Sequence, residues 1–164
     1  MRGVLRVPLR YHARVTIALT VQIRRLASAE GLTLPAYMTP GAAGMDLHAA
    51  LVEDVVIEPG AIVLVPTGLE VAIPEGFEGQ VRPRSGLAVK HGISLPNTPA
   101  TIDADYRGEI RVPLINLGRE PFAIARGMRI AQLIVAPVMR VDWDEVEELP
   151  ATTRAGQGFG HSGV

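Results

Sequence analysis

Residues 58–79, EPGAIVLVPTGLEVAIPEGFEG, indicate the fold class of this chain. The segments 61–65 and 69–73 are too short for helices and rich in β-branched residues, so we predict that both are strands. Turn signals built from Gly and Pro surround them, at Glu58-Pro59-Gly60, Pro66-Thr67-Gly68, Pro74-Glu75-Gly76 and Phe77-Glu78-Gly79.

The same pattern continues along the rest of the chain. We predict further strands at Leu19–Arg24, Leu47–Ala50, Val55–Ile57, Gln80–Arg82, Glu109–Leu117, Phe122–Ile124 and Ile130–Val141. Only Ser85–His91 has the pattern of a helical turn, closed by Gly92. Many short strands with Gly and Pro between them predict an all-β sandwich or barrel of antiparallel strands.

Several predicted strands are continuous apolar runs, such as Ile62–Val65 and Leu133–Val138. Runs of this kind are typical of strands buried on both faces. A small sandwich covers only one face of each sheet, whereas a subunit interface can cover the other. The pattern therefore favours an oligomer with an apolar centre.

The composition limits the class of protein. With 164 residues the chain is most simply one domain with a sizeable core. A net charge of −1 gives no bulk attraction to nucleic acid or to an acidic membrane. The absence of cysteine excludes disulfides and thiolate metal sites and suits a reducing cytoplasm. The sequence contains no run of 18 apolar residues, so we expect no membrane span.

The two ends of the chain differ from its middle. The first 29 residues contain six arginines and no acid, which a targeting peptide or an unstructured extension would explain. We favour the extension, because Thr16 and Thr20 interrupt the apolar run and no convincing small-residue cleavage site follows. We expect a disordered basic extension over 1–18, a β-domain over 19–150 and a mobile, glycine-rich arm over 151–164.

Residues 97–116, NTPATIDADYRGEIRVPLIN, place two carboxylates and a tyrosine in what reads as an apolar hairpin. Carboxylates are costly to bury unless something satisfies or uses them. An aspartate close to Tyr106 and Arg107, such as Asp103, is therefore a candidate site residue. For Asp105 we favour a structural role, as an acid paired with a nearby arginine.

Two other segments could bind an anion. In Arg82–Ala88 a helix begins at Ser85, where backbone N–H groups favour a phosphate, and Gly86 would let it approach. Ser85 could instead be a simple helix N-cap. Gln132 lies in an apolar strand, where it is either a ligand-binding amide or a core amide with satisfied hydrogen bonds. Asp46 reads as a turn residue bonded to its own backbone.

Five segments, in order, resemble the five motifs of the homotrimeric dUTP pyrophosphatases, the dUTPase family. They are Ala43–Ala50, Arg82–Ala88, the segment beginning at Asn97, Arg129–Leu133 and Arg154–Gly163. The resemblance implies a trimeric jelly-roll, or distorted β-barrel, with a flexible C-terminal arm. It also implies hydrolysis of dUTP to dUMP and pyrophosphate with Mg²⁺, which limits uracil in DNA and supplies dUMP for dTMP synthesis.

The resemblance implies roles for individual residues. Asp103 would activate a water for attack on the α-phosphorus. Tyr106 would lie under the deoxyribose and exclude a ribose. The uracil would be read by Asn97 and by the main chain near Thr101, Ile102 and Arg111.

The resemblance implies that residues of the other motifs bind the phosphates and the metal ion. The phosphate contacts would come from Arg84, Ser85, Gly86 and Gln132, with Mg²⁺ held mainly by the substrate and touching Asp46 through water. The arm would close over a neighbouring subunit's site, with Phe159 stacked on uracil and Arg154 at the γ-phosphate. Gly160, His161 and Ser162 would complete the phosphate contacts.

The chain departs from the family pattern at four positions. Ala100 replaces a glycine and would be strained if its φ were positive. Met128 replaces an aspartate, and Ala155 and Gln157 replace glycines of the arm.

Two alternative functions stay open. A dCTP deaminase would carry a catalytic Glu three residues before Asn116, where this chain has Pro113. A non-catalytic regulatory trimer would bind nucleotide without needing Asp103. We expect dUTP as the ligand, a homotrimer with sites at subunit interfaces, no direct nucleic-acid or membrane contact, and a cytoplasmic location.

Overall fold

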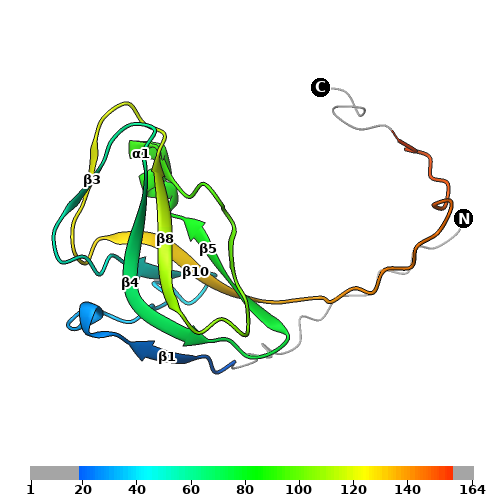
Figure 1. Cartoon of the computed structure of the whole chain (residues 1–164), viewed down its shortest axis with the longest axis horizontal. Coiled ribbons are helices and arrows are strands. Elements are labelled where there is room, and N and C mark those ends of the chain that lie inside the picture. Colours follow the sequence, from blue (N-terminus) through cyan, green and yellow to red (C-terminus); the bar gives the residue numbers. More distant parts are fainter. Residues whose placement is uncertain (1–18, 157–164) are drawn as a thin grey trace, which may run out of the picture.

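The computed structural model describes residues 19–156, which form a β-sandwich with a long arm leading away from it (Figure 1). Its elements are β1 (Gln22–Arg25), a 3-10 helix η1 (Ala27–Ala29), β2 (Met45–His48), β3 (Val55–Ile57), β4 (Ile62–Ala72), β5 (Phe77–Pro83), α1 (Ser85–His91), β6 (Ile93–Ser94), β7 (Ala100–Ile102), β8 (Glu109–Asn116), β9 (Phe122–Ile124) and β10 (Arg129–Pro137). None of the helices in this part of the chain is long and apolar enough to cross a membrane.

Two four-stranded sheets make up the sandwich. Their strand orders are β1-β4-β8-β6 and β2-β10-β5-β7, and β3 and β9 form a separate two-stranded ribbon. All the strand pairs are antiparallel. The all-β class predicted from the spacing of turn signals is confirmed, and the fold agrees with the jelly-roll that the family resemblance implied.

The core lies between the two sheets. Along each strand, alternate side chains point to opposite faces, and the inward set is aliphatic. The buried side chains include Val65, Val112 and Leu114 from one sheet and Leu47, Val81 and Leu133 from the other. The side chains on the outer face of the sheet β2-β10-β5-β7 do not pack in this core, so they can be polar.

The Pro66-Thr67-Gly68 turn predicted from the sequence is wrong. These residues lie inside the eleven-residue strand β4, at an irregularity where the register with β8 shifts. The Thr67 hydroxyl donates to the Ile110 carbonyl at 2.7 Å, and the Gly68 N–H donates to Glu109 Oε1 at 2.8 Å. Side chains thus satisfy the backbone that a turn would otherwise have satisfied, so the strand continues.

The predicted turn at Phe77-Glu78-Gly79 is also wrong, because these residues open β5. A Cβ at Gly79 would stand 2.8 Å from Ile73 Cδ1, so this glycine serves close packing of a strand. The turns ending at Gly60 and Gly76 are confirmed, each with a positive φ at its glycine.

The single predicted helix is confirmed as α1, ended by Gly92 at φ 69°. The alternative of Ser85 as an N-cap is wrong, because Arg84 occupies the cap position and no side chain caps the helix. The sequence did not predict η1, β6 or β7, and β2 begins two residues earlier than expected.

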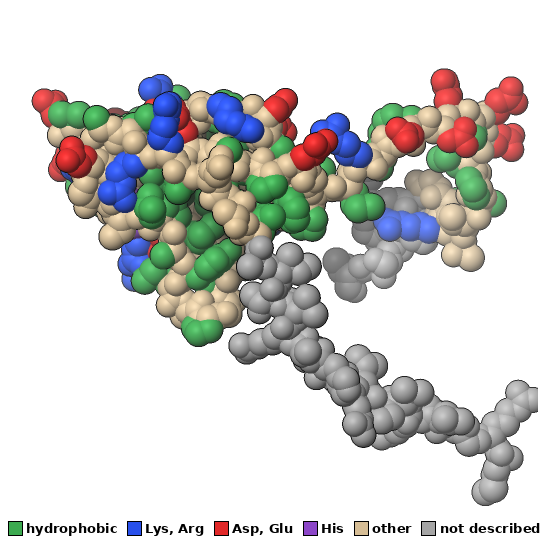
Figure 2. Space-filling model, turned by 90° about the horizontal axis from the view of Figure 1, so that it is seen from below, with side chains coloured by type: hydrophobic (Ala, Val, Ile, Leu, Met, Phe, Trp, Pro, Cys, Tyr) green, Lys and Arg blue, Asp and Glu red, His purple; other side chains and the backbone are tan. Residues whose placement is uncertain are grey.

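The chain leaves the sandwich after β10. The Val138 N–H still donates to the Gly76 carbonyl at 2.9 Å, and from there the backbone runs outward (Figure 1). We call residues 139–164 the arm, which includes the glycine-rich end 151–164; the structure describes 139–156. Acidic side chains gather on it (Figure 2), and its single tryptophan, Trp143, is 92% exposed.

Candidate active site

Residues 97–116 do not form a hairpin of two paired strands, which corrects the expectation from the sequence. β7 pairs with β5, and β8 pairs with β4 and β6, so the two strands belong to different sheets. The sequence analysis named β8 as a strand but not β7, and apolar alternation carries no information on which strand pairs with which. The loop 103–108 therefore connects the two sheets.

A pocket of about 310 Å³ opens where β7 and β8 diverge. We call it the β7–β8 pocket. Its lining residues are Leu64, Val81, Asn97, Ala100, Thr101, Ile102, Asp103, Tyr106, Glu109, Ile110, Arg111 and Pro113. The first part of β8 pairs with β4 on one side, and β6 pairs only with its end, at Ile115 and Asn116. Among residues 19–156, the edge of β7 away from β5 and the first part of β8 away from β4 therefore pair with no strand, and residues of both line the pocket.

The loop that carries Asp103 is held by its own backbone and by Arg107. The Tyr106 N–H donates to the Asp103 carbonyl at 3.1 Å. Arg107 Nη1 donates to the carbonyls of Ala104 and Tyr106 at 2.6 and 2.7 Å. Among residues 19–156 the ion pairs do not include Asp105, so the predicted Asp105–arginine pair is wrong: the arginine beside it binds carbonyl oxygens.

Tyr106 stands against the turn that follows it. Its hydroxyl donates to the Glu109 carbonyl at 3.0 Å, and the ring passes over Gly108. A Cβ at Gly108 would lie 2.4 Å from the hydroxyl, so any side chain there would displace the tyrosine. The ring is 44% exposed at the mouth of the β7–β8 pocket, where a ligand can cover it.

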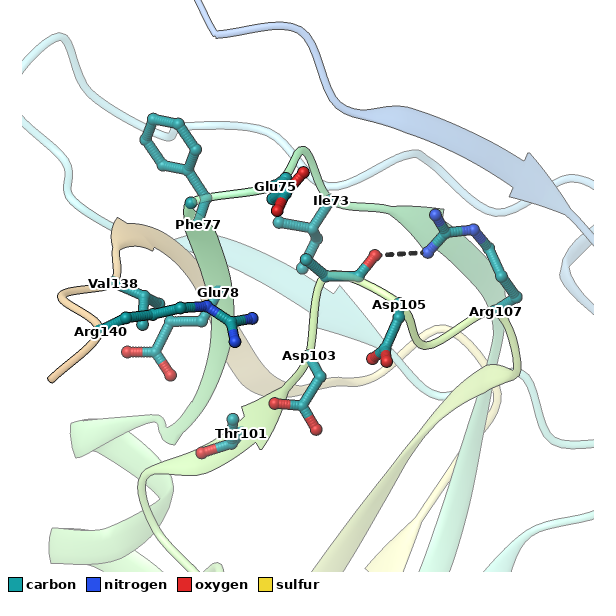
Figure 3. A pocket seen from close by; sticks show the side chains of 12 residues that line it. Ile73, Glu75, Phe77, Glu78, Thr101, Asp103, Asp105, Arg107, Val138 and Arg140 are labelled. Atoms are coloured by element: carbon teal, nitrogen blue, oxygen red, sulfur yellow. Dashed lines mark hydrogen bonds between the residues drawn. The ribbon is translucent and has the colours of Figure 1, made fainter. Parts of the chain in front are cut away.

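A second hollow, of about 620 Å³, adjoins the first and shares Thr101 and Asp103 with it. Asp103, Asp105 and Arg140 point into this hollow (Figure 3). Asp103 therefore stands between two openings, accessible from the base-sized pocket and from solvent.

A second group of predicted site residues meets on the outer face of the sheet β2-β10-β5-β7. Asp46 is buried and accepts hydrogen bonds from Arg84 Nε at 3.1 Å, Arg129 Nη1 at 3.2 Å and Gln132 Nε2 at 3.5 Å. We call these four residues the Asp46 cluster. Asp46 lies in β2, so its interpretation as a turn residue is wrong. The sequence analysis assigned no role to Arg129, which stands three residues before Gln132 in the same strand.

A bulge in β10 explains that spacing. Residues three apart on a regular strand point to opposite faces. Here the register with β2 shifts between Arg129 and Ala131, so one residue is inserted. Arg129 and Gln132 consequently reach the same carboxylate from the same face.

His48 lies beside the Asp46 cluster, opposite Arg129 in the β2–β10 register. Burial lowers the pKa of His48, the Asp46 carboxylate opposes this, and the guanidinium groups of Arg129 and Arg84 add to the lowering. At the end of β5, Ser85 and Gly86 follow Arg84 in exposed positions, and a Cβ at Gly86 would meet nothing within 4 Å.

Asp46 could contact a metal ion only indirectly. Among the described residues no group of three or more acidic, His or Cys side chains is arranged to hold a metal. The Asp46 carboxylate has about four acceptor positions. Three are occupied by the cluster, so one lone pair of Oδ2 can accept from a metal-bound water. These residues fit an ion that arrives with its own oxygen ligands.

The departures from the family pattern have mild local consequences. Ala100 pairs with Val81 in β7 and has no positive φ, so the expected strain is absent. The Met128 side chain packs against the core while its backbone makes the turn into β10. Ala155 has φ 45°, a left-handed conformation that glycine adopts more easily.

Of the predicted residues of the arm, the structure describes Arg154 and Ala155. Arg154 is exposed on the arm. Gln157, Phe159, Gly160, His161 and Ser162 lie outside the described residues, as does the basic extension 1–18.

A base-sized pocket next to a carboxylate, together with a cluster of arginine and amide groups, defines a nucleotide-binding class of β-sandwich. Comparison with known proteins identifies the family. The dUTPase family model matches residues 30–163, and the chain belongs to that family.

Curated relatives agree with this assignment. Deoxyuridine 5′-triphosphate nucleotidohydrolase of Desulfotalea psychrophila is 62% identical over 135 residues, which cover 82% of this chain and 90% of that protein. The protein of the same name from Caldanaerobacter subterraneus subsp. tengcongensis is 51% identical, covering 90% of this chain and all of its own length.

Solved structures agree as well. The dUTPase of Staphylococcus bacteriophage 80alpha with dUpNHpp has a TM-score of 0.79 at 28% identity, covering 88% of this chain and 99% of that one. A mutant dUTPase of phage phi11 of S. aureus, described with a structural Mg(II) ion, has a TM-score of 0.70 at 26% identity, covering 79% and 97%.

Proposed function

We propose that this chain hydrolyses dUTP to dUMP and pyrophosphate. The observation that carries the proposal is the β7–β8 pocket with Asp103 at its mouth, in a chain of the dUTPase family. The curated relatives are named for this reaction, and the 80alpha dUTPase structure contains the analogue dUpNHpp. The reaction would limit uracil in DNA and supply dUMP.

Uracil enters the β7–β8 pocket. The amide of Asn97 offers a donor and an acceptor, and the unpaired backbone near Thr101, Ile102 and Arg111 offers more, which suits the alternating edge of the base. Pro113 and Leu64 form an apolar wall, which leaves little room for the methyl group of thymine. Tyr106, fixed by Glu109, lies under the sugar and excludes a 2′-hydroxyl.

The phosphates bind at the Asp46 cluster with Ser85 and Gly86, and we propose that they belong to the site of a neighbouring subunit. Asp46, Gln132 and Arg82 are in register across three strands, whereas Ile102 pairs with Gly79, three residues before Arg82. Within one chain, Asp46 and Ile102 are thus separated by roughly 14 Å across the sheet and 10 Å along it. In a site shared between two copies, the Asp46 cluster of one copy can lie next to the β7–β8 pocket of the other without spanning this separation.

An apolar patch on the sheet β1-β4-β8-β6 also supports our proposal that the chain forms a homotrimer. Ile62 and Leu64 of β4 are 57% and 53% exposed, and they pair with Ile115 and Pro113 of β8. Paired residues lie on one face of a sheet. We call these four residues the β4–β8 patch. A subunit packed on this patch would also close the outer wall of the β7–β8 pocket, because Leu64 and Pro113 line both.

Asp103 acts as the general base. Its carboxylate holds a water and accepts one proton from it while the water oxygen bonds to the α-phosphorus. The bond from the α-phosphorus to the bridging oxygen breaks, and pyrophosphate leaves. The solvent-open hollow beside Asp103 offers the proton a route out.

Asp46 would hold Mg²⁺ indirectly, through a water that donates to the remaining lone pair of Oδ2, and the ion would supply charge neutralisation on the phosphate oxygens. Arg84, Arg129 and Gln132 keep that carboxylate in place.

The C-terminal arm completes the site of a neighbour. Arg154 reaches the γ-phosphate, and Phe159 stacks on the uracil, with Gly160, His161 and Ser162 at the phosphates. The arm already leads away from its own sandwich, which supports a destination on another copy (Figure 1). No nucleic acid or membrane takes part, and the cytoplasm is the compartment that we propose.

The test is pyrophosphate release from dUTP with Mg²⁺, measured beside dTTP, dCTP and UTP. Turnover confined to dUTP is the expected result. Ammonia released from dCTP would favour the deaminase instead, although Pro113 lines the pocket at the place where that enzyme needs an acid. Tight binding of dUTP without turnover would favour the regulatory trimer.

A further inference from the structure

His48 lies next to the Asp46 cluster, and neither the family motifs nor the proposed reaction assigns it a task. It ends β2, two residues after Asp46, and residues two apart on a strand share a face. Leu47, between them, is fully buried in the core. The imidazole therefore lies on the outward face of the sheet, the face that carries the Asp46 cluster.

Its neighbours confirm this placement. Arg129, which bonds to Asp46, is the cross-strand partner of His48. The electrostatic partners of the imidazole are Asp46, Arg129 and Arg84, all members of the cluster. His48 thus lies within the field of the two guanidinium groups to which we assign the phosphates.

The imidazole has no hydrogen-bond partner of its own within residues 19–156. The side-chain hydrogen bonds there occupy Asp46 with Arg84, Arg129 and Gln132, and none involves His48. Imidazole carries at least one N–H donor in either protonation state. A half-buried donor beside two arginines, without an acceptor among residues 19–156, is suited to an acceptor that arrives with the ligand.

We propose that His48 donates a hydrogen bond to the triphosphate held at the Asp46 cluster and thereby helps to distinguish dUTP from dUMP. This inference rests on the proposed function, because it needs the phosphates at that cluster. A bond from one neutral donor to a charged oxygen is stronger than one to a neutral acceptor. Its loss should weaken affinity for the triphosphate and leave the nucleoside half of the ligand unaffected.

The experiment compares His48→Phe, which keeps a ring but removes the N–H groups, with His48→Gln, which keeps a donor. Calorimetry measures binding of dUpNHpp and of dUMP, and steady-state assays measure KM and kcat for dUTP. We expect His48→Phe to weaken dUpNHpp binding and raise KM about tenfold, with dUMP binding and kcat nearly unchanged. His48→Gln should recover most of the loss.

The matched control is His91→Phe. His91 lies at the end of α1 with its ring 4.7 Å from that of Phe122, away from the cluster, so its replacement should leave all four quantities unchanged. Should His48→Phe fail to fold, His48→Ala provides the same comparison. Unchanged dUpNHpp binding in a folded variant, an equal loss for dUMP, or no recovery with glutamine would overturn the proposal. Failure of the wild-type chain to bind dUpNHpp or hydrolyse dUTP would instead overturn the proposed function.

Discussion

The position of Tyr106 depends on the absence of a side chain at Gly108. The tyrosine ring passes over that residue, and its hydroxyl donates to Glu109. In Gly108→Ala the new methyl group would stand 2.4 Å from the hydroxyl, so the ring must move. We expect discrimination between dUTP and UTP, measured as the ratio of kcat/KM values, to fall by roughly tenfold.

The matched control for that variant is Gly41→Ala. Gly41 has an ordinary φ and open space around it, so alanine should be tolerated there. If Gly108→Ala keeps wild-type discrimination, Tyr106 does not read the sugar.

Asp103 can be tested against its neighbour. Asp103→Asn keeps the shape of the side chain but removes the proton acceptor, and loss of a general base costs about 10²- to 10⁴-fold in rate. We expect turnover of dUTP to fall by this range, with an unchanged melting temperature and dUpNHpp bound normally. Asp105→Asn is the control, because Asp105 does not line the β7–β8 pocket and should retain most activity. Comparable rates in both variants would remove Asp103 from the water-activation step.

The position of a site residue was predictable where a sequence motif contains it. The surroundings of a residue were unpredictable where its hydrogen-bond partners lie far away in the sequence. The motifs located Asn97, Asp103 and Tyr106, which the structure brings to one pocket. The partners of Asp46 come from residues 38 and 83 positions away, so local spacing indicated a turn where a buried ion-pair cluster exists.

At the scale of elements, the β-branched segments and the Gly and Pro turn signals predicted most strands but not how the strands pair. Val55–Ile57 and Phe122–Ile124 were predicted with correct bounds. The continuity of β4 was missed because Thr67 and Glu109 satisfy the backbone from a distance. The separation of β7 from β8 was missed for another reason, because alternation predicts a strand but not the strands it pairs with.

The edge strand β1 is joined to β4 by the directly opposed pair Arg24–Glu70. The hydrogen bond from Arg24 lowers the pKa of Glu70 and outweighs the opposing effect of burial. A carboxylate with a lowered pKa in the folded state stabilises that state above its unfolded pKa, near 4.5, and the contribution is lost as the pH falls below it.

We therefore expect Glu70→Gln to speed hydrogen exchange of the β1 amides at neutral pH, and we expect the effect to disappear as the pH falls through the lowered pKa of Glu70. The effect should be small and should fade in high salt, because Arg24 is largely exposed. Glu53→Gln, an exposed acid outside the ion pairs of residues 19–156, is the control. Equal protection of β1 in wild type and Glu70→Gln at neutral pH would contradict the prediction.

At the scale of the whole molecule, the β4–β8 patch decides the oligomer that we propose. Ile62 is exposed in the single chain, so Ile62→Asp should fold, but a carboxylate buried in an interface without a partner is costly. We expect light scattering to give the mass of a monomer and dUTP turnover to be lost. Val52→Asp, at a position 93% exposed away from the patch, should remain trimeric and active. A trimeric Ile62→Asp would place the interface elsewhere.

The arm can be separated from assembly by deleting Arg154–Val164. This truncation removes the residues to which we assign uracil stacking and γ-phosphate contact and leaves the β4–β8 patch and Trp143 intact. Base stacking contributes about 1–3 kcal/mol, so we expect kcat/KM for dUTP to fall about 10- to 100-fold or more, with the trimer mass unchanged. Trp143 is the only tryptophan of the chain, so its fluorescence shows whether the first half of the arm keeps its surroundings after the deletion. An active truncated trimer would mean that the sandwich alone completes the site. A monomeric product would instead assign the end of the arm to assembly, because a segment that serves only as a lid has no part in holding subunits together.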